Sequence, residues 1–283
     1  MLFVPYSADF KWNATSSDVR PATNYGTALT PGNNTQGTPA TLISGATITE
    51  DVWGILINFN SAASSNQARN ILVNILADPA GGTSYTTTLI ASLLGSCAAP
   101  YNIGNGGIWY YFPLGIPAGY SIGASAAVNN ATVGTIYAQC WVFGQPRRPD
   151  IARRGRFVIP VGATTATSSG APVTPGTTAE GAWAELGTLE RSAWWWQMGF
   201  GVSDNSMTVL AYHCDLAAGD ASNKNDLVIN QLVTTTSTEQ MNNMLAMAQN
   251  NNNVASGSIV YGRAWCSGTP DSNVSMIAYA LGG

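Results

Sequence analysis

The chain has 283 residues, of which 45% are apolar and only 9% are charged, and its formal net charge is −4. The apolar share is sufficient for a folded core and excludes an intrinsically disordered chain. The acidic balance argues against nucleic acid as a partner bound by bulk electrostatics. A membrane partner is not expected either, because no apolar run reaches the roughly 18 residues of a membrane-spanning helix.

The first half of the chain reads as a series of short strands. A possible arm around Trp12 precedes a turn at Thr30-Pro31-Gly32, and alternating or apolar runs bounded by Gly, Pro, Asn and Ser follow it. Such runs are typical of β-strands. We predict strands at residues 52–59, 70–76, 85–94, 108–114, 121–128 and 135–143.

The middle of the chain has the composition of a linker. Residues 145–156 hold two prolines, and residues 147–156 hold five arginines: Arg147, Arg148, Arg153, Arg154 and Arg156. Proline-rich and charged stretches of this kind separate domains. We predict a first domain at residues 1–146, a basic linker at residues 147–156 and a second domain at residues 157–283.

The second half repeats the pattern of short strands and turns predicted for the first. Strands are expected at residues 194–201, 207–214, 226–234, 258–266 and 275–281, and residues 239–249 are interpreted as irregular. Thr174-Pro175-Gly176 and then Gly181 correspond to Thr30-Pro31-Gly32 and then Gly37. Matches in the same order continue between residues 51–57 and 193–199, which places Trp53 opposite Trp195, and between residues 122–130 and 260–268. The sequence therefore predicts an all-β protein with two tandem antiparallel β-sandwich (jelly-roll-like) domains related by internal duplication.

The residue types that carry catalysis are scarce. His213 is the single histidine, and it lies between apolar neighbours on a predicted strand. The carboxylates are scattered, and Asp78 and Asp220 open equivalent turns. No pair of acids is placed for glycoside hydrolysis, and no residue cluster has metal-ligand spacing. We predict that the chain is not an enzyme and binds no metal and no cofactor.

The four cysteines are more typical of a core than of a redox site. No Cys-x-x-Cys motif is present, and Cys140, Cys214 and Cys266 stand where the other half has small or apolar residues. Buried thiols are favoured, and disulfides between Cys97 and Cys140 and between Cys214 and Cys266 are the alternative.

Trp194-Trp195-Trp196 is the most informative local feature. Successive side chains of a strand point to opposite faces, so at least one of these indoles must leave the core. It can contact the other domain, a second subunit or a sugar ring, and aromatic enrichment at interfaces favours a protein contact. Together with Trp53 and the five linker arginines, which could dock onto an acidic surface or pair locally with Asp150, these residues are the candidate interface.

Several of these features resemble those of structural proteins of tailed bacteriophage particles. The resemblance is carried by the two Thr-Pro-Gly turns, by residues 78–85 and by residues 193–197, and it extends over most of both halves. It implies a decoration or cement, collar, baseplate or fibre protein that forms symmetric oligomers with other virion proteins. It also implies assembly in the bacterial cytoplasm and a final location in the virion.

The sequence thus favours a non-enzymatic virion component that acts through wide surfaces of low charge, where neutral polar groups hydrogen-bond and aromatic residues anchor. The alternative is a carbohydrate-binding module that attaches the particle to a host glycan, and a depolymerase is a weaker third option.

Overall fold

The computed structural model describes residues 10–12, 26–61, 69–97, 108–129, 135–144, 155–163, 169–201, 210–234, 253–268 and 274–282. The prediction of an irregular segment at residues 239–249 falls outside them. Within the described residues the protein is all-β, with one short 3-10 turn at Gly45–Thr47. None of these residues forms a helix that is both long and apolar enough to cross a membrane.

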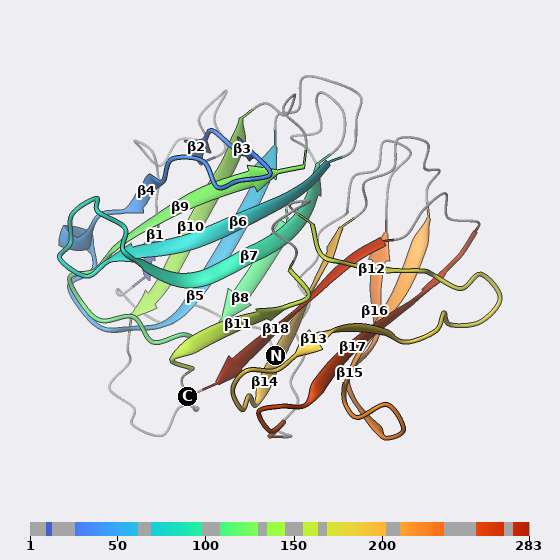
Figure 1. Cartoon of the computed structure of the whole chain (residues 1–283). Helices are drawn as coiled ribbons and strands as arrows, with labels where there is room; N and C mark the ends of the chain where they lie inside the picture. Colours follow the sequence, from blue (N-terminus) through green and yellow to red (C-terminus); the bar gives the residue numbers. More distant parts are fainter. Residues whose placement is uncertain are drawn as a thin grey trace.

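The first half folds into two sheets that enclose a core (Figure 1). One sheet has the order β1-β10-β5-β8, with β2 also paired to β10, and the other has the order β3-β9-β6-β7, with β4 also paired to β9. The ten strands are β1 (Phe10–Trp12), β2 (Thr27–Leu29), β3 (Gly32–Asn33), β4 (Ala40–Ile43), β5 (Val52–Ser61), β6 (Arg69–Asp78), β7 (Thr87–Cys97), β8 (Ile108–Phe112), β9 (Ser121–Val128) and β10 (Ile136–Gly144).

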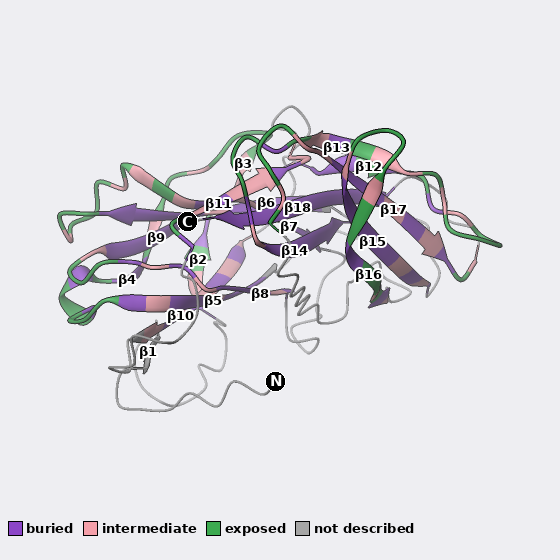
Figure 2. Cartoon of the chain, turned by 90° about the horizontal axis from the view of Figure 1, so that it is seen from below, coloured by how far each residue is buried: buried purple, intermediate pink, exposed green. Residues whose placement is uncertain are grey.

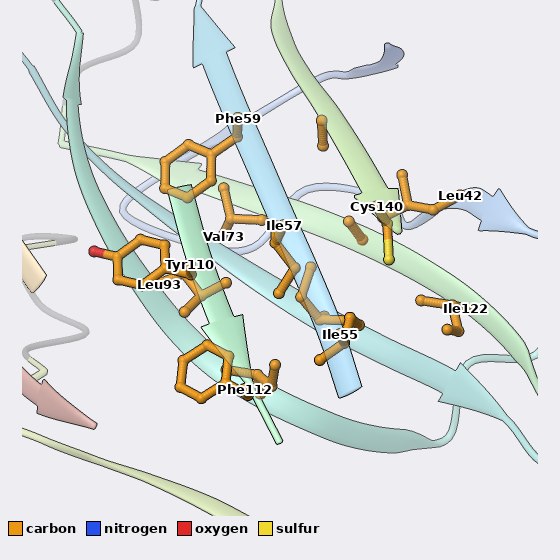
Figure 3. Close-up of a cluster of buried hydrophobic side chains, with 14 of the residues drawn as sticks. Leu42, Ile55, Ile57, Phe59, Val73, Leu93, Tyr110, Phe112, Ile122 and Cys140 are labelled. Carbon is orange, nitrogen blue, oxygen red and sulfur yellow. The ribbon is translucent and has the colours of Figure 1, made fainter. Parts of the chain in front are cut away.

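This strand order is that of a jelly roll. If β1 and β3 are set aside, eight strands remain, which can be counted from β2 as the first to β10 as the eighth. One sheet then contains the first, eighth, third and sixth strands, and the other contains the second, seventh, fourth and fifth. Alternate side chains of both sheets meet in the core, where Ile57 of β5 and Val73 of β6 are fully buried (Figure 3).

The second half has the same strand order. β12 and β14 flank β18, β11 extends along the β12 side of β18, and the other sheet has the order β13-β17-β15-β16. In the jelly-roll order, the sixth strand of this half would come between β16 and β17. Residues 235–252, which connect these two strands, lie outside the described part of the chain. The strands are β11 (Phe157–Val161), β12 (Ala171–Val173), β13 (Ala184–Thr188), β14 (Trp195–Gly201), β15 (Ala211–Gly219), β16 (Lys224–Thr234), β17 (Ile259–Cys266) and β18 (Val274–Gly282).

The prediction of an all-β protein with antiparallel sandwiches is confirmed. The predicted long strands lie where the periodicity placed them, except that the strand expected at residues 207–214 is found at Ala211–Gly219. The internal duplication stays a prediction, although the shared strand order agrees with it.

The two Thr-Pro-Gly turns are built in the same way. The amide of Gly37 donates to the carbonyl of Ala126, and the amide of Gly181 donates to the carbonyl of Ala264. A Cβ atom at either glycine would collide with the carbonyl oxygen of the Thr seven residues earlier in the chain. Glycine is therefore required at both positions by close backbone approach.

The register of the strands corrects the alignment of the tryptophans by one residue. Trp141 pairs with Leu56, and at the equivalent place in the second half Tyr279 pairs with Gln197. This register places Gly54 opposite Trp195, so the counterpart of Trp53 is Trp194.

Candidate interaction site

The two halves meet where an edge strand of one lies on a sheet face of the other. β7 is the edge of its sheet, and it packs against β11 and β14 of the second half (Figure 1). The Tyr279 hydroxyl, on β18, donates to the Ser92 carbonyl at 2.7 Å and accepts from the Leu94 amide at 2.7 Å. A single phenol therefore satisfies two backbone groups of an unpaired strand edge, which would be costly to bury alone.

Aromatic rings surround this contact. Tyr279 meets Tyr110 edge to face with ring centroids 5.4 Å apart, and Trp195 lies 5.5 Å from Phe112. The Tyr110 hydroxyl donates to the Leu94 carbonyl at 2.5 Å. Burial raises the pKa of the Tyr110 and Tyr279 phenols well above the ordinary value, so both remain protonated donors.

Close approach of the halves depends on glycines in β14. A Cβ atom at Gly199 would lie 2.8 Å from the Tyr279 hydroxyl and 2.9 Å from the Tyr110 hydroxyl. At Gly201 it would lie 2.6 Å from Oδ1 of Asn70, whose Nδ2 donates to the Ser275 hydroxyl at 3.1 Å. The contacts that a Cβ atom would make at Gly199 and Gly201 are too short, so neither position of β14 can carry a side chain.

The three consecutive tryptophans have three different environments. Trp196 is fully buried in the core of its own half, and Trp195 is 7% exposed and belongs to the core cluster of the first half. Trp194 is half-buried and packs against that same cluster. Of the three outlets considered from the sequence, the structure places Trp195 against the other half of the same chain.

The outer face of β10 and its neighbours carries a second set of aromatic rings. Trp141 stacks on Trp109 with centroids 5.2 Å apart, and Trp53 lies 5.5 Å from Phe143. These residues are half-buried, as is Tyr137 on the same face. This face is equivalent to the buried face of β18 in the second half.

The arginine cluster can be placed only in part. Arg156 is exposed, and its amide donates to the Gly282 carbonyl at 2.7 Å. Arg147, Arg148, Arg153 and Arg154 lie outside the described residues, as does most of the predicted linker. The linker and the domain boundaries stay predictions.

A charged cluster that the sequence did not indicate lies on the second half. Arg263 forms ion pairs with Glu180 at 2.5 Å and with Asp215 at 2.8 Å, and its guanidinium lies 4.3 Å from the Trp183 ring centroid. Asp215 also accepts the Asn230 amide at 2.6 Å. Glu180 belongs to the Gly176–Gly181 turn, so the cluster ties this turn to β15 and β17.

The residues weighed for other chemistry have structural environments. Cys140, Cys214 and Cys266 are buried thiols, and burial raises the pKa of the Cys140 and Cys214 thiols well above the ordinary value. His213 is half-buried, with Trp265 edge to face at 5.2 Å. Asp78 and Asp220 accept backbone amides of their own turns, which lowers the pKa of the Asp220 carboxyl. Across the described ranges, no three His, Cys, Asp or Glu side chains come together as a metal site.

Apart from Trp194 and Trp195, the residues that make the contact between the halves were not singled out from the sequence. Tyr279, Leu94 and Tyr110 have ordinary strand patterns, and only their positions relative to the other half distinguish them. One signal in the sequence could have pointed to Tyr279. The repeat matches near the ends of the two halves place it opposite another aromatic residue, Trp141.

Comparison with known proteins assigns no family. No family model matches the chain, and no curated protein matches it. A chain of Broad Bean Stain Virus matches with a TM-score of 0.36 and 8% identity over 90% of this chain and 86% of that chain. PNGase F, a glycosylasparaginase from Flavobacterium meningosepticum, matches with a TM-score of 0.36 and 10% identity over 96% of each chain. The CBM22-1–CBM22-2 tandem domain of Paenibacillus barcinonensis Xyn10C matches with a TM-score of 0.24 and 10% identity over 93% of this chain and 99% of that one.

These matches correct one prediction from the sequence. The chain was predicted not to be an enzyme, and that exclusion is wrong because the matching structures include a glycosylasparaginase. Viral chains are among the matches as well. At such low TM-scores none of them assigns an activity, a ligand or a partner to this chain.

Proposed function

We propose that this protein is a structural component of a tailed bacteriophage particle, a capsid decoration or cement protein or a similar accessory protein. It acts through protein–protein contacts with other virion proteins and with copies of itself. It assembles in the bacterial cytoplasm and resides in the virion.

The proposal rests on the kind of surface that holds the two halves of the chain together. The halves meet over buried aromatic rings and hydrogen bonds between neutral groups, with no ion pair among the described contacts between them. The outer face of β10 presents a second aromatic face of the same kind. Aromatic residues with few charges are typical of interface centres.

The proposal is tested with particles of the phage whose genome encodes this chain. Particles purified through a density gradient are expected to contain the chain at a fixed copy number, measured by quantitative mass spectrometry. Particles from a deletion strain are expected to bind the purified chain saturably. Absence of the chain from particles that contain the other structural proteins would overturn the proposal.

A carbohydrate-binding role is the second candidate, and the outer face of β10 favours it. Trp141 and Trp53 are only half-buried, and Gln139 lies on the same face as Trp141. Flat aromatic rings beside an amide can stack on a sugar and bind its hydroxyls. Titration with host polysaccharide would then quench tryptophan fluorescence saturably, and Trp141→Ala would abolish the change while the chain stays folded.

A further inference from the structure

The contact between the halves joins two unlike surfaces. One is the edge of a sandwich, formed by β7, and the other is the outer face of a sheet, where β11 and β14 flank β18. Leu94 of β7 is fully buried there, and the Tyr279 hydroxyl closes the β7 edge. Each half of the chain has both kinds of surface because the halves share one strand order.

The counterpart of β7 is β16, and its edge faces outward. Ser92 and Asn230 occupy equivalent positions, with positive φ angles of 57° and 52° and amides that donate to Asn74 and Asp215. Two residues further on, Leu94 corresponds to Leu232, which is 53% exposed. Together with Ile229, which is 61% exposed, Leu232 makes part of the exposed surface of β16 apolar. Figure 2 shows exposed stretches along β16.

The counterpart of the buried β18 face is the outer face of β10. The β18 residues Ser275, Ile277, Tyr279 and Leu281 are at most 9% exposed. The equivalent β10 residues, which are only half-buried, are Tyr137, Gln139, Trp141 and Phe143. The chain therefore uses one edge and one sheet face internally and presents the equivalent edge and face on its surface.

We propose that the β16 edge of one copy docks onto the outer β10 face of a second copy, as β7 docks onto β18 within the chain. The occupant is a second copy because each copy carries both complementary surfaces. Both are uncharged at their centres, so docking buries Ile229, Leu232 and the aromatic face without burying an unpaired charge. Since the surfaces differ, each copy leaves one of each available, and the contact propagates into a ring if its rotation closes.

This self-association rests on the proposed function, of which it specifies the contact between copies of the chain, but its test requires no virus particle. Analytical ultracentrifugation of the full chain is expected to show a concentration-dependent oligomer larger than a dimer. Leu232→Asp places a charge in the edge and is expected to give a monomer at the same concentrations. Asn225→Asp, which adds the same charge at an exposed position of the same strand, is expected to assemble like the parent.

A mixing experiment tests whether the contact is between unlike surfaces. Tyr137→Glu disrupts the face and leaves the edge intact, whereas Leu232→Asp does the reverse. Each variant alone is expected to be monomeric, and an equimolar mixture is expected to form one-to-one dimers and nothing larger. Circular dichroism and thermal melting check that each variant is folded, and Gln139→Lys replaces Tyr137→Glu if the latter is not.

Three results would overturn the proposal. They are a parent chain that is monomeric at every concentration, a Leu232→Asp variant that assembles like the parent, or folded variants whose mixture stays monomeric. Because these measurements use the chain alone, their failure is separate from a failure to bind phage particles.

Discussion

Arg263 shows how one residue position can be neutral in one half of the molecule and charged in the other. Its equivalent in the first half is Ser125, which donates to Gln36 at 2.7 Å. In the second half Arg263 instead neutralises Glu180 and Asp215, and the Asp215 side chain is only 3% exposed. A carboxylate this buried needs its partner.

We therefore expect Arg263→Ser to reduce the free energy of unfolding by about 3 kcal/mol, because it leaves the Asp215 charge buried and uncompensated. The triple variant Glu180→Gln, Asp215→Asn, Arg263→Ser reproduces the polar groups of the first half and should regain at least half of that loss. Urea denaturation measures both. A single variant as stable as the parent would contradict this role of Arg263.

The buried phenols predict a loss of stability at alkaline pH. Tyr110 and Tyr279 have pKa values raised by burial, whereas in the unfolded chain they ionise near 10.0. Their contribution is fully present below pH 10.0 and declines above it, because the unfolded state releases protons that the native state retains. Each group steepens the decline by about 1.4 kcal/mol per pH unit.

Urea denaturation between pH 8 and pH 11 checks this expectation. Tyr110→Phe removes one of these buried phenols and should flatten the alkaline decline relative to the parent. An equally steep decline in that variant would mean that other groups cause it.

At the scale of elements, β14 combines two roles in seven residues, Trp195–Gly201. Its inward side chains, Trp196, Met198 and Phe200, fill the core of the second half. Its outward side presents Trp195 to the first half and glycines where β7 approaches. One strand thus contributes to a core and to an interface through the alternation of its side chains.

The alanine variants of the three tryptophans should separate these roles. Trp196→Ala is expected to reduce the free energy of unfolding by about 3–5 kcal/mol, as for a large buried side chain. Trp195→Ala should cost less, and Trp194→Ala, at a half-buried site, should cost the least. Three variants that all unfold like the parent would contradict this assignment.

The sequence predicted the long strands well because their alternation reflects burial within one sandwich. β5 and β10 are examples, with inward Ile55 and Ile57 opposite Val142 and Cys140. The short strands β2, β4, β12 and β13 were missed, since three to five residues rich in Thr, Ala, Gly and Pro have no readable period.

The contact between the halves could not be read from the sequence for a different reason. The alternation of β18 identifies its two faces but not which of them meets another domain. The role of Tyr279 is visible only in the folded structure, where its hydroxyl forms hydrogen bonds with the backbone of the β7 edge. The aromatic content of Trp194–Trp196 indicated that an indole must leave the core of its own half, but not where Trp195 would pack.

At the scale of the whole molecule, the shared core couples the two halves. Ile277, Tyr279 and Leu281 of β18 belong to the same buried cluster as the core of the first half. We expect differential scanning calorimetry to show one unfolding transition whose calorimetric and van't Hoff enthalpies agree. Two separate transitions in the parent chain would contradict the coupling. Tyr279→Asp, which breaks the contact, is expected to split the transition.

The central claim is that the chain is a building element of a phage particle. Immunogold electron microscopy of particles, with antibody against this chain, tests it most directly. Label is expected at regularly repeated sites on the particle, and particles from a deletion strain should carry none. Intact wild-type particles that bind no antibody, while the antibody recognises the purified folded chain, would contradict the claim.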